Sequence, residues 1–131
     1  MTYVQLADLL YNFRAKHLIL GQPDHARDKC DLISVEFRQY AEERGHAARL
    51  VKGFVTTTWN GRIVVLQGHV AVELNGNTVV DWTARQFGIN EDFPRVVDTK
   101  VWTADWPPLP KSAEPHQPRH LRQPATRGET A

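Results

Sequence analysis

Apolar residues recur at every third or fourth position in two stretches of the first half of the chain, which is the spacing of one helical face. The first stretch predicts a helix over residues 3–19, ended by Gly21. The second predicts a helix over about 29–44, with Asp28 as its cap and Gly45 just after its end. The residues that share these two faces are Leu6, Leu9, Leu10, Phe13 and His17, then Cys30, Ile33, Phe37 and Ala41.

From Ala47 onward the pattern changes to alternating and β-branched residues, which are typical of strands. Asn60-Gly61 and Asn75-Gly76-Asn77 predict turns within this region. Helices followed by an antiparallel meander define an α+β fold. The expected strands cover residues 49–51, 54–59, 63–66, 69–74 and 78–82, with a further edge strand at 94–97.

Prolines are concentrated at the end of the chain, where residues 107–131 contain six of the eight and no aromatic residue. This composition predicts a disordered, Pro-rich tail following one domain at residues 1–106. Trp102 and Trp106 lie just before the tail, and we expect them to fold back on the domain as an apolar clasp.

Composition excludes several classes of protein. A chain of 131 residues holds one domain, and its single cysteine excludes an internal disulfide and a thiolate metal cage. A net charge of +1 gives no electrostatic footprint for nucleic acid. No apolar run is long enough to span a membrane and the N-terminus lacks the pattern of a signal peptide, so we expect a cytoplasmic protein with no nucleic-acid or membrane partner.

The single cysteine, Cys30, falls in the first turn of the second predicted helix. Unpaired backbone amides and the positive end of the helix dipole stabilise a thiolate at such a position. Cys30 also shares the apolar face of Ile33 and Phe37, so its side chain is expected to face the domain. The alternative is a small core residue, because free cysteines are among the most buried residues.

A cysteine nucleophile needs a base, and His69 and Asp81 lie on two strands of one predicted hairpin. If residues 74–76 form the loop, His69 lies directly opposite Asp81. If the loop is the two residues Asn75-Gly76, Val70 faces Asp81 and the pair is split. The register of the hairpin therefore decides whether the two side chains share a face.

The order of these motifs resembles the papain-like, transglutaminase-type superfamily. The likeness spans about residues 30–88: a helix that starts at Cys30, then Val51-Lys52-Gly53, Gly-His-Val-Ala-Val-Glu at 68–73, and Val-Val-Asp-Trp-Thr-Ala-Arg-Gln-Phe at 79–87. The superfamily includes transglutaminases, protein-glutamine deamidases, arylamine acetyltransferases, thiol peptidases and the papain-fold toxin domains of bacteria and phages. It implies a core in which the Cys helix packs on an antiparallel sheet.

The resemblance also implies a catalytic triad of Cys30, His69 and Asp81. Peptidases of this kind place a Gln shortly before the Cys, which makes Gln22 a candidate oxyanion donor beside the backbone amides at the helix start. Gln86 is a second candidate for the site, or else a turn residue. His25 and Asn12 are competing donors. The chain departs from the family in having no aromatic residue two positions after His69 and no Trp next to Cys30.

The sequence thus predicts a cysteine-dependent amide hydrolase, a peptidase or glutamine deamidase, that acts on a protein or peptide through a thioester and needs no cofactor. The alternatives are a transglutaminase or acyltransferase of the same fold and a non-catalytic, papain-like protein-binding module. Asp24, His25, Asp28 and Cys30 cluster within seven residues, but their spacing is not a recurring zinc pattern, so a polar loop is preferred to a metal site.

Overall fold

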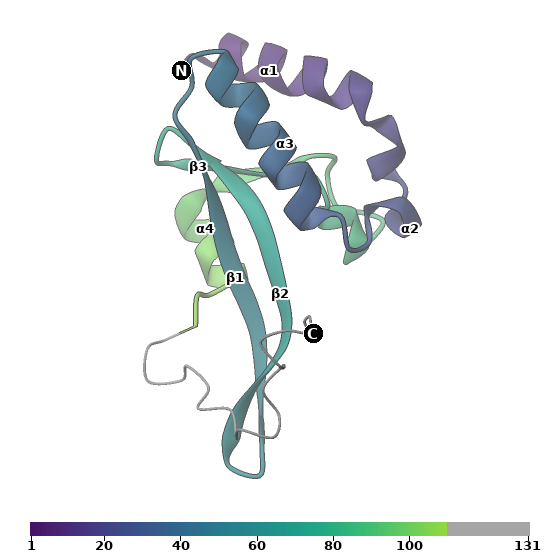
Figure 1. Cartoon of the computed structure of the whole chain (residues 1–131), viewed down its shortest axis with the longest axis vertical. Helices are drawn as coiled ribbons and strands as arrows, with labels where there is room; N and C mark the ends of the chain where they lie inside the picture. Colours follow the sequence, from purple (N-terminus) through teal and green to yellow (C-terminus); the bar gives the residue numbers. More distant parts are fainter. Residues whose placement is uncertain (110–131) are drawn as a thin grey trace, which may run out of the picture.

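The computed structural model describes residues 1–109. Figure 1 shows a helical layer packed on one face of a twisted sheet, with a short helix on the other face. The elements in chain order are α1 (Tyr3–Lys16), η1 (Leu18–Gly21), α2 (Pro23–Ala26), α3 (Cys30–Glu43), β1 (Ala48–Trp59), β2 (Arg62–Leu74), β3 (Thr78–Asp81), η2 (Ala84–Gln86), β4 (Arg95–Asp98) and α4 (Thr99–Asp105).

The described strands form one antiparallel sheet in the order β1-β2-β3-β4, so the predicted α+β class is confirmed. The predicted edge strand at 94–97 is β4. The four short strands expected between residues 49 and 74 are wrong as separate elements, because β1 and β2 run without a break through Gly53 and Gly68. A register shift between Val55 and Thr56 lets the two long strands bend and stay paired.

The helices follow the predicted periodicity with two corrections. Residues 3–19 are not one helix: α1 ends at Lys16, and a short 3-10 turn follows. Asp28 does not cap α3, because its own backbone is left-handed (φ 60°) and Lys29 is the residue before the first turn. Gly45 does take the expected left-handed conformation after α3 (φ 84°), which only glycine adopts without strain.

The sheet separates two apolar clusters. On the side of α1 and α3, the buried residues include Phe13, Phe37, Val72, Leu74 and Trp82. On the side of α4, Trp102 packs with Ala71 and Val79, while Trp106 covers the cluster. The predicted clasp of Trp102 and Trp106 is therefore confirmed.

The β1–β2 hairpin extends well beyond the rest of the domain as a two-stranded arm, defined here as residues 55–66 (Figure 1). Asn60 and Gly61 form its tip, with left-handed φ values of 51° and 74°, as the Asn-Gly signal predicts.

The contacts of the domain continue past its predicted end at residue 106, because the Phe54 amide donates to the carbonyl oxygen of Pro107 at 2.9 Å. Most of the predicted tail at 107–131 lies outside the described residues. Within residues 1–109 no helix combines the length and the apolar character that crossing a membrane requires.

Candidate active site

Cys30 is the first residue of α3, as expected, and its side chain is partly exposed. No side chain caps this helix, so the backbone amides of its first turn remain as donors beside the sulfur. One turn further on, the buried Ser34 donates from Oγ to the carbonyl oxygen of Val70 at 3.2 Å. This bond fastens the start of α3 to β2 next to His69.

Both registers expected for the β2–β3 hairpin are wrong. Leu74 pairs with Thr78, which leaves residues 75–77 as the loop. Asn75 and Gly76 both take left-handed backbone conformations there, with φ values of 53° and 76°. The loop has three residues, but it starts one residue later than the three-residue loop considered from the sequence.

The observed pairing differs by two residues from the register that would set His69 directly opposite Asp81, and it keeps both side chains on one face of the sheet. The ladder pairs Val72 with Val80, so its next step sets Ala71 opposite Asp81, and His69 is the diagonal neighbour on the same face. Because side chains alternate with a period of two, a register shift of two residues preserves the face. The small side chain of Ala71 leaves room for the imidazole to reach across to the carboxylate.

His69 and Asp81 form a buried pair, 1% and 2% exposed, with Nε2 of the imidazole 2.6 Å from Oδ2 of the carboxylate. The backbone amide of Thr83 donates to Oδ1 at 3.1 Å, and Nε1 of Trp102 donates to Oδ2 at 3.4 Å. A buried carboxylate is costly unless it is hydrogen-bonded. These donors from three elements therefore hold Asp81 in one orientation toward His69.

The other ring nitrogen of His69, Nδ1, is buried and makes no hydrogen bond of ordinary geometry within residues 1–109. Burial is the largest influence on the pKa of His69 and lowers it. Hydrogen bonding and charge from Asp81 and from the Cys30 side chain outweigh burial and raise the pKa to about 9. Asp81 occupies Nε2 of the ring, so Nδ1 is the nitrogen left without a hydrogen bond among residues 1–109. Both the Asp81 carboxylate and the Cys30 side chain therefore favour the protonated form of the ring.

Aromatic rings enclose the imidazole. The ring centroids of Phe87 and Trp106 lie 4.8 Å and 4.7 Å from that of His69. Trp106 can lie this close because Gly53, the partner of His69 in the β1–β2 ladder, has no side chain: a Cβ there would overlap the carbonyl oxygen and Cβ of Trp106. The glycine of the Val51-Lys52-Gly53 motif is therefore needed for the packing of Trp106 over His69.

Gln86 joins the two loops that carry the site. Its Nε2 donates to Oγ1 of Thr83 at 3.1 Å, and its Oε1 accepts from the backbone amide of Asp28 at 3.4 Å. Both ends of the amide are therefore used in connecting the segment after Asp81 to the segment before Cys30. This is the turn role that the sequence left open.

Gln22 lies in the exposed link between η1 and α2, where its backbone carbonyl accepts from the amides that follow at 3.0 Å. His25 and Asn12 are exposed as well. Within residues 1–109, no hydrogen bond joins the side chain of any of these three candidate donors to Cys30 or His69. The structure brings His69 and Asp81 together in a hydrogen bond, and the Cys30 side chain influences the pKa of His69, whereas Gln22 takes part in neither.

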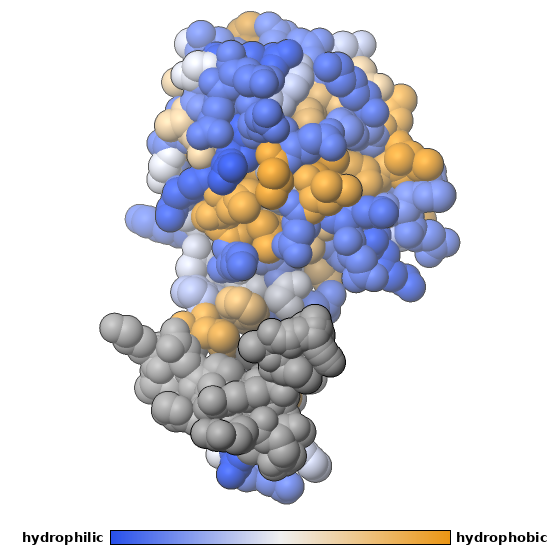
Figure 2. All heavy atoms as spheres, in the orientation of Figure 1, coloured by the Kyte–Doolittle hydropathy of each residue, from blue (hydrophilic) through white to orange (hydrophobic). Residues whose placement is uncertain are grey.

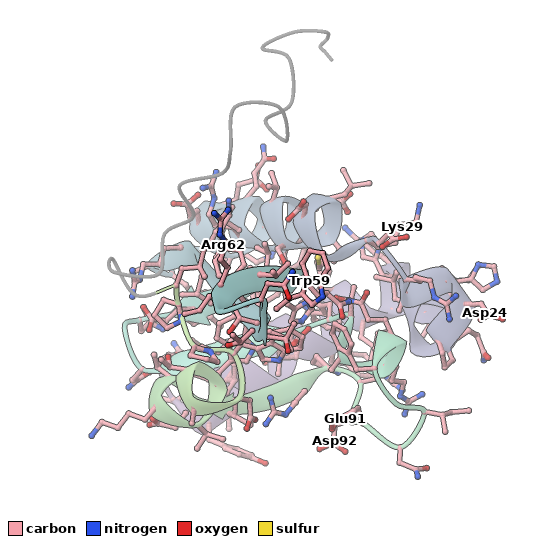
Figure 3. All side chains as sticks on the ribbon, turned by 90° about the horizontal axis from the view of Figure 1, so that it is seen from below. Asp24, Lys29, Trp59, Arg62, Glu91 and Asp92 are labelled. Atoms are coloured by element: carbon pink, nitrogen blue, oxygen red, sulfur yellow. The ribbon has the colours of Figure 1, made fainter. Side chains whose placement is uncertain are left out.

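The side chains considered for a metal site before α3, Asp24, His25 and Asp28, are exposed. Asp24 is 93% exposed in its side chain, and Figure 3 shows Asp24 and Lys29 directed away from the body of the domain. Among the described residues, no group of three or more His, Cys, Asp or Glu side chains is positioned to hold a metal ion.

Two residues of the site were missed from the sequence. Ser34 carries a signal that could have found it, because it is a polar residue one turn after Cys30 on the buried side of α3. Trp102 was expected only as an apolar contact. Its hydrogen bond to Asp81 depends on how α4 docks on the sheet, which no local pattern encodes.

Comparisons with protein-family models, with curated proteins and with solved structures find no match for this chain. The resemblance to the papain-like superfamily therefore rests on the sequence motifs alone.

Proposed function

We propose that the protein is a cysteine-dependent amide hydrolase of papain-like type, a peptidase or a glutamine deamidase. Cys30 is the nucleophile, His69 the acid and base, and Asp81 the group that orients the histidine. The observation that carries the proposal is the imidazole of His69, which is bonded to Asp81 through Nε2 and has Nδ1 free of hydrogen bonds among residues 1–109, while Cys30 at the start of α3 helps to raise its pKa.

The charge state of His69 supports the first half of the reaction. With a pKa of about 9, His69 carries a proton at neutral pH. The thiolate of Cys30 attacks the carbonyl carbon of the amide, and the electron pair of the C=O bond moves to oxygen. The C–N bond then breaks, and the leaving amine or ammonia takes the proton from Nδ1 of His69. The products are a thioester on Cys30 and a neutral imidazole.

Water completes the cycle. His69, now neutral, accepts a proton from water as its oxygen attacks the thioester carbon. The C–S bond breaks, the carboxylic acid leaves, and the pair of Cys30 thiolate and protonated His69 is restored. The uncapped amides of the first turn of α3 supply donors for the oxyanion in both halves.

Mass spectrometry of peptides incubated with the protein tests the proposal. A panel of peptides containing glutamine, with and without a primary amine as acceptor, separates the outcomes. Deamidation adds about 1 Da, cleavage gives fragments, and transfer to the amine gives a cross-linked product with loss of ammonia. We expect hydrolysis, because a domain of this size offers little surface for two elaborate substrate pockets.

Matched variants give the controls. Cys30→Ala and His69→Gln should abolish turnover, whereas His46→Gln removes an imidazole beyond the end of α3 and should leave turnover unchanged. A wild-type protein that forms no product and no covalent adduct on Cys30 with any peptide would reject the hydrolase and favour the non-catalytic binding module.

A further inference from the structure

The arm exposes apolar side chains, and among residues 1–109 no further strand pairs with it. Trp59 is 71% exposed at its end, and Val55, Ile63 and Val64 are also exposed. A two-stranded hairpin is at best marginally stable alone in water. In Figure 3 the arm points toward the reader, with Trp59 and Arg62 at its near end. Figure 2 shows hydrophobic residues where the arm leaves the domain.

In the part of the chain that the structure describes, the outer edge of β1 is open along the arm. β1 is the first strand of the sheet, so one of its edges pairs with no other strand among residues 1–109. The amide of Phe54 points to this edge, because it donates to Pro107. Backbone groups alternate in direction along a strand, so those of Thr56 and Thr58 also point outward. The backbone groups of Trp59 point toward β2 instead, because Trp59 and Arg62 are the pair that flanks the two-residue turn.

We propose that the arm is a dimerisation element, and that β1 of one copy pairs with β1 of a second copy in antiparallel orientation, centred on Thr57. In this register Thr56 and Thr58 of the two copies exchange the outward hydrogen bonds of their backbones. The bond between Phe54 and Pro107 ends the free edge at one side, and the turn at Asn60 ends it at the other. The centred register is therefore the one that uses the whole open stretch.

The side chains are self-complementary in this register. Val55 of one copy faces Trp59 of the other, which is an aromatic and β-branched pair on the same face of the sheet. Thr57 faces itself across the twofold axis, and Thr56 faces Thr58. Such pairs stabilise antiparallel strands, and residues 53–59 contain no charged side chain that would repel its own copy.

The proposed seam, in which residues 55–59 of the two copies pair, does not include the candidate active site. It ends before Phe54, so Trp106 and His69 keep the neighbours described above. The inference is therefore independent of the proposed chemistry. Because five residues from each copy make a small interface, the dimer should be weak and depend on concentration.

Sedimentation velocity of the full chain over a range of concentrations tests the proposal. We expect the mass to rise from 15.0 kDa toward twice that value. Thr57→Lys places two like charges face to face at the axis and should hold the protein as a monomer. The control is Val64→Lys, which adds the same charge across the hairpin from Thr57 but away from the seam and should still dimerise.

A mixing experiment keeps the test independent of folding effects in one variant. Thr57→Lys and Thr57→Glu should each be monomeric alone and form a heterodimer when mixed, because residue 57 faces its own copy. A wild-type protein that stays monomeric at every concentration overturns the proposal. Equal disruption by Thr57→Lys and Val64→Lys, or no rescue on mixing, overturns the register.

Discussion

Nε2 of His69 lies 2.6 Å from Oδ2 of Asp81 although the two residues are diagonal, not direct, neighbours across the β2–β3 ladder. Ala71 occupies the position opposite Asp81, and its methyl group leaves the space through which the imidazole reaches the carboxylate. A larger residue at position 71 would fill the path of this contact. The contact between His69 and Asp81 therefore depends on Ala71, whose methyl group takes no part in the proposed reaction.

Asp81→Asn should lower turnover by on the order of 10²–10⁴-fold, because the amide no longer favours the protonated imidazole or fixes its tautomer. The same change should lower the pKa of His69 from about 9, since Asp81 supplies both a hydrogen bond and a charge that raise it. Titration of the imidazole by NMR measures this directly. An unchanged His69 titration would show that the carboxylate does not control the ring.

Gly53→Ala should destabilise the fold by about 1–3 kcal/mol and loosen the cover of His69, because the new methyl group overlaps the backbone of Trp106. Gly68→Ala is the matched control in the same pair of strands. A Cβ at position 68 meets the ring of Phe54 at 3.3 Å, and this side chain can move; the nearest backbone atom, the carbonyl oxygen of Gly53, is at an ordinary contact distance of 4.0 Å. Urea unfolding of both variants measures the difference, and equal losses would contradict the packing role of Gly53.

Stability should fall as the pH rises from about 6.5 to about 9. His69 has a pKa raised from 6.5 to about 9 in the folded chain, so folding favours its protonated form. This contribution, up to about 3 kcal/mol, is fully present below the unfolded pKa and is lost as the pH rises through the folded pKa. Urea unfolding at about pH 6 and about pH 9 measures it. His69→Gln should remove this part of the pH dependence, and an unchanged slope in that variant would assign it to other groups.

Local signals predicted much of the fold. The spacing of Ile33, Phe37 and Ala41 gave α3 to within a residue at each end, and the two Asn-Gly pairs marked both hairpin turns. The alternation in β2 assigned His69 to one face and Val72 to the other. Each of these features depends on neighbours in the sequence, so a pattern within a short window is sufficient to predict it.

The remaining errors come from contacts between distant segments. Gly53 looked like a break between two strands, whereas β1 continues through it and its missing side chain makes room for Trp106 from beyond the sheet. The register at Leu74 and Thr78 is set by a loop whose length the Asn-Gly-Asn sequence does not define. The bond from Trp102 to Asp81 depends on the docking of α4.

The rate at which iodoacetamide alkylates Cys30 at pH 6–7 tests the central claim most directly, since it needs no known substrate. With a protonated His69 to favour the thiolate, the wild-type protein should react at least about tenfold faster than His69→Gln, whose thiolate loses this stabilisation. Equal rates in the two proteins would contradict the activated nucleophile on which the proposed chemistry depends.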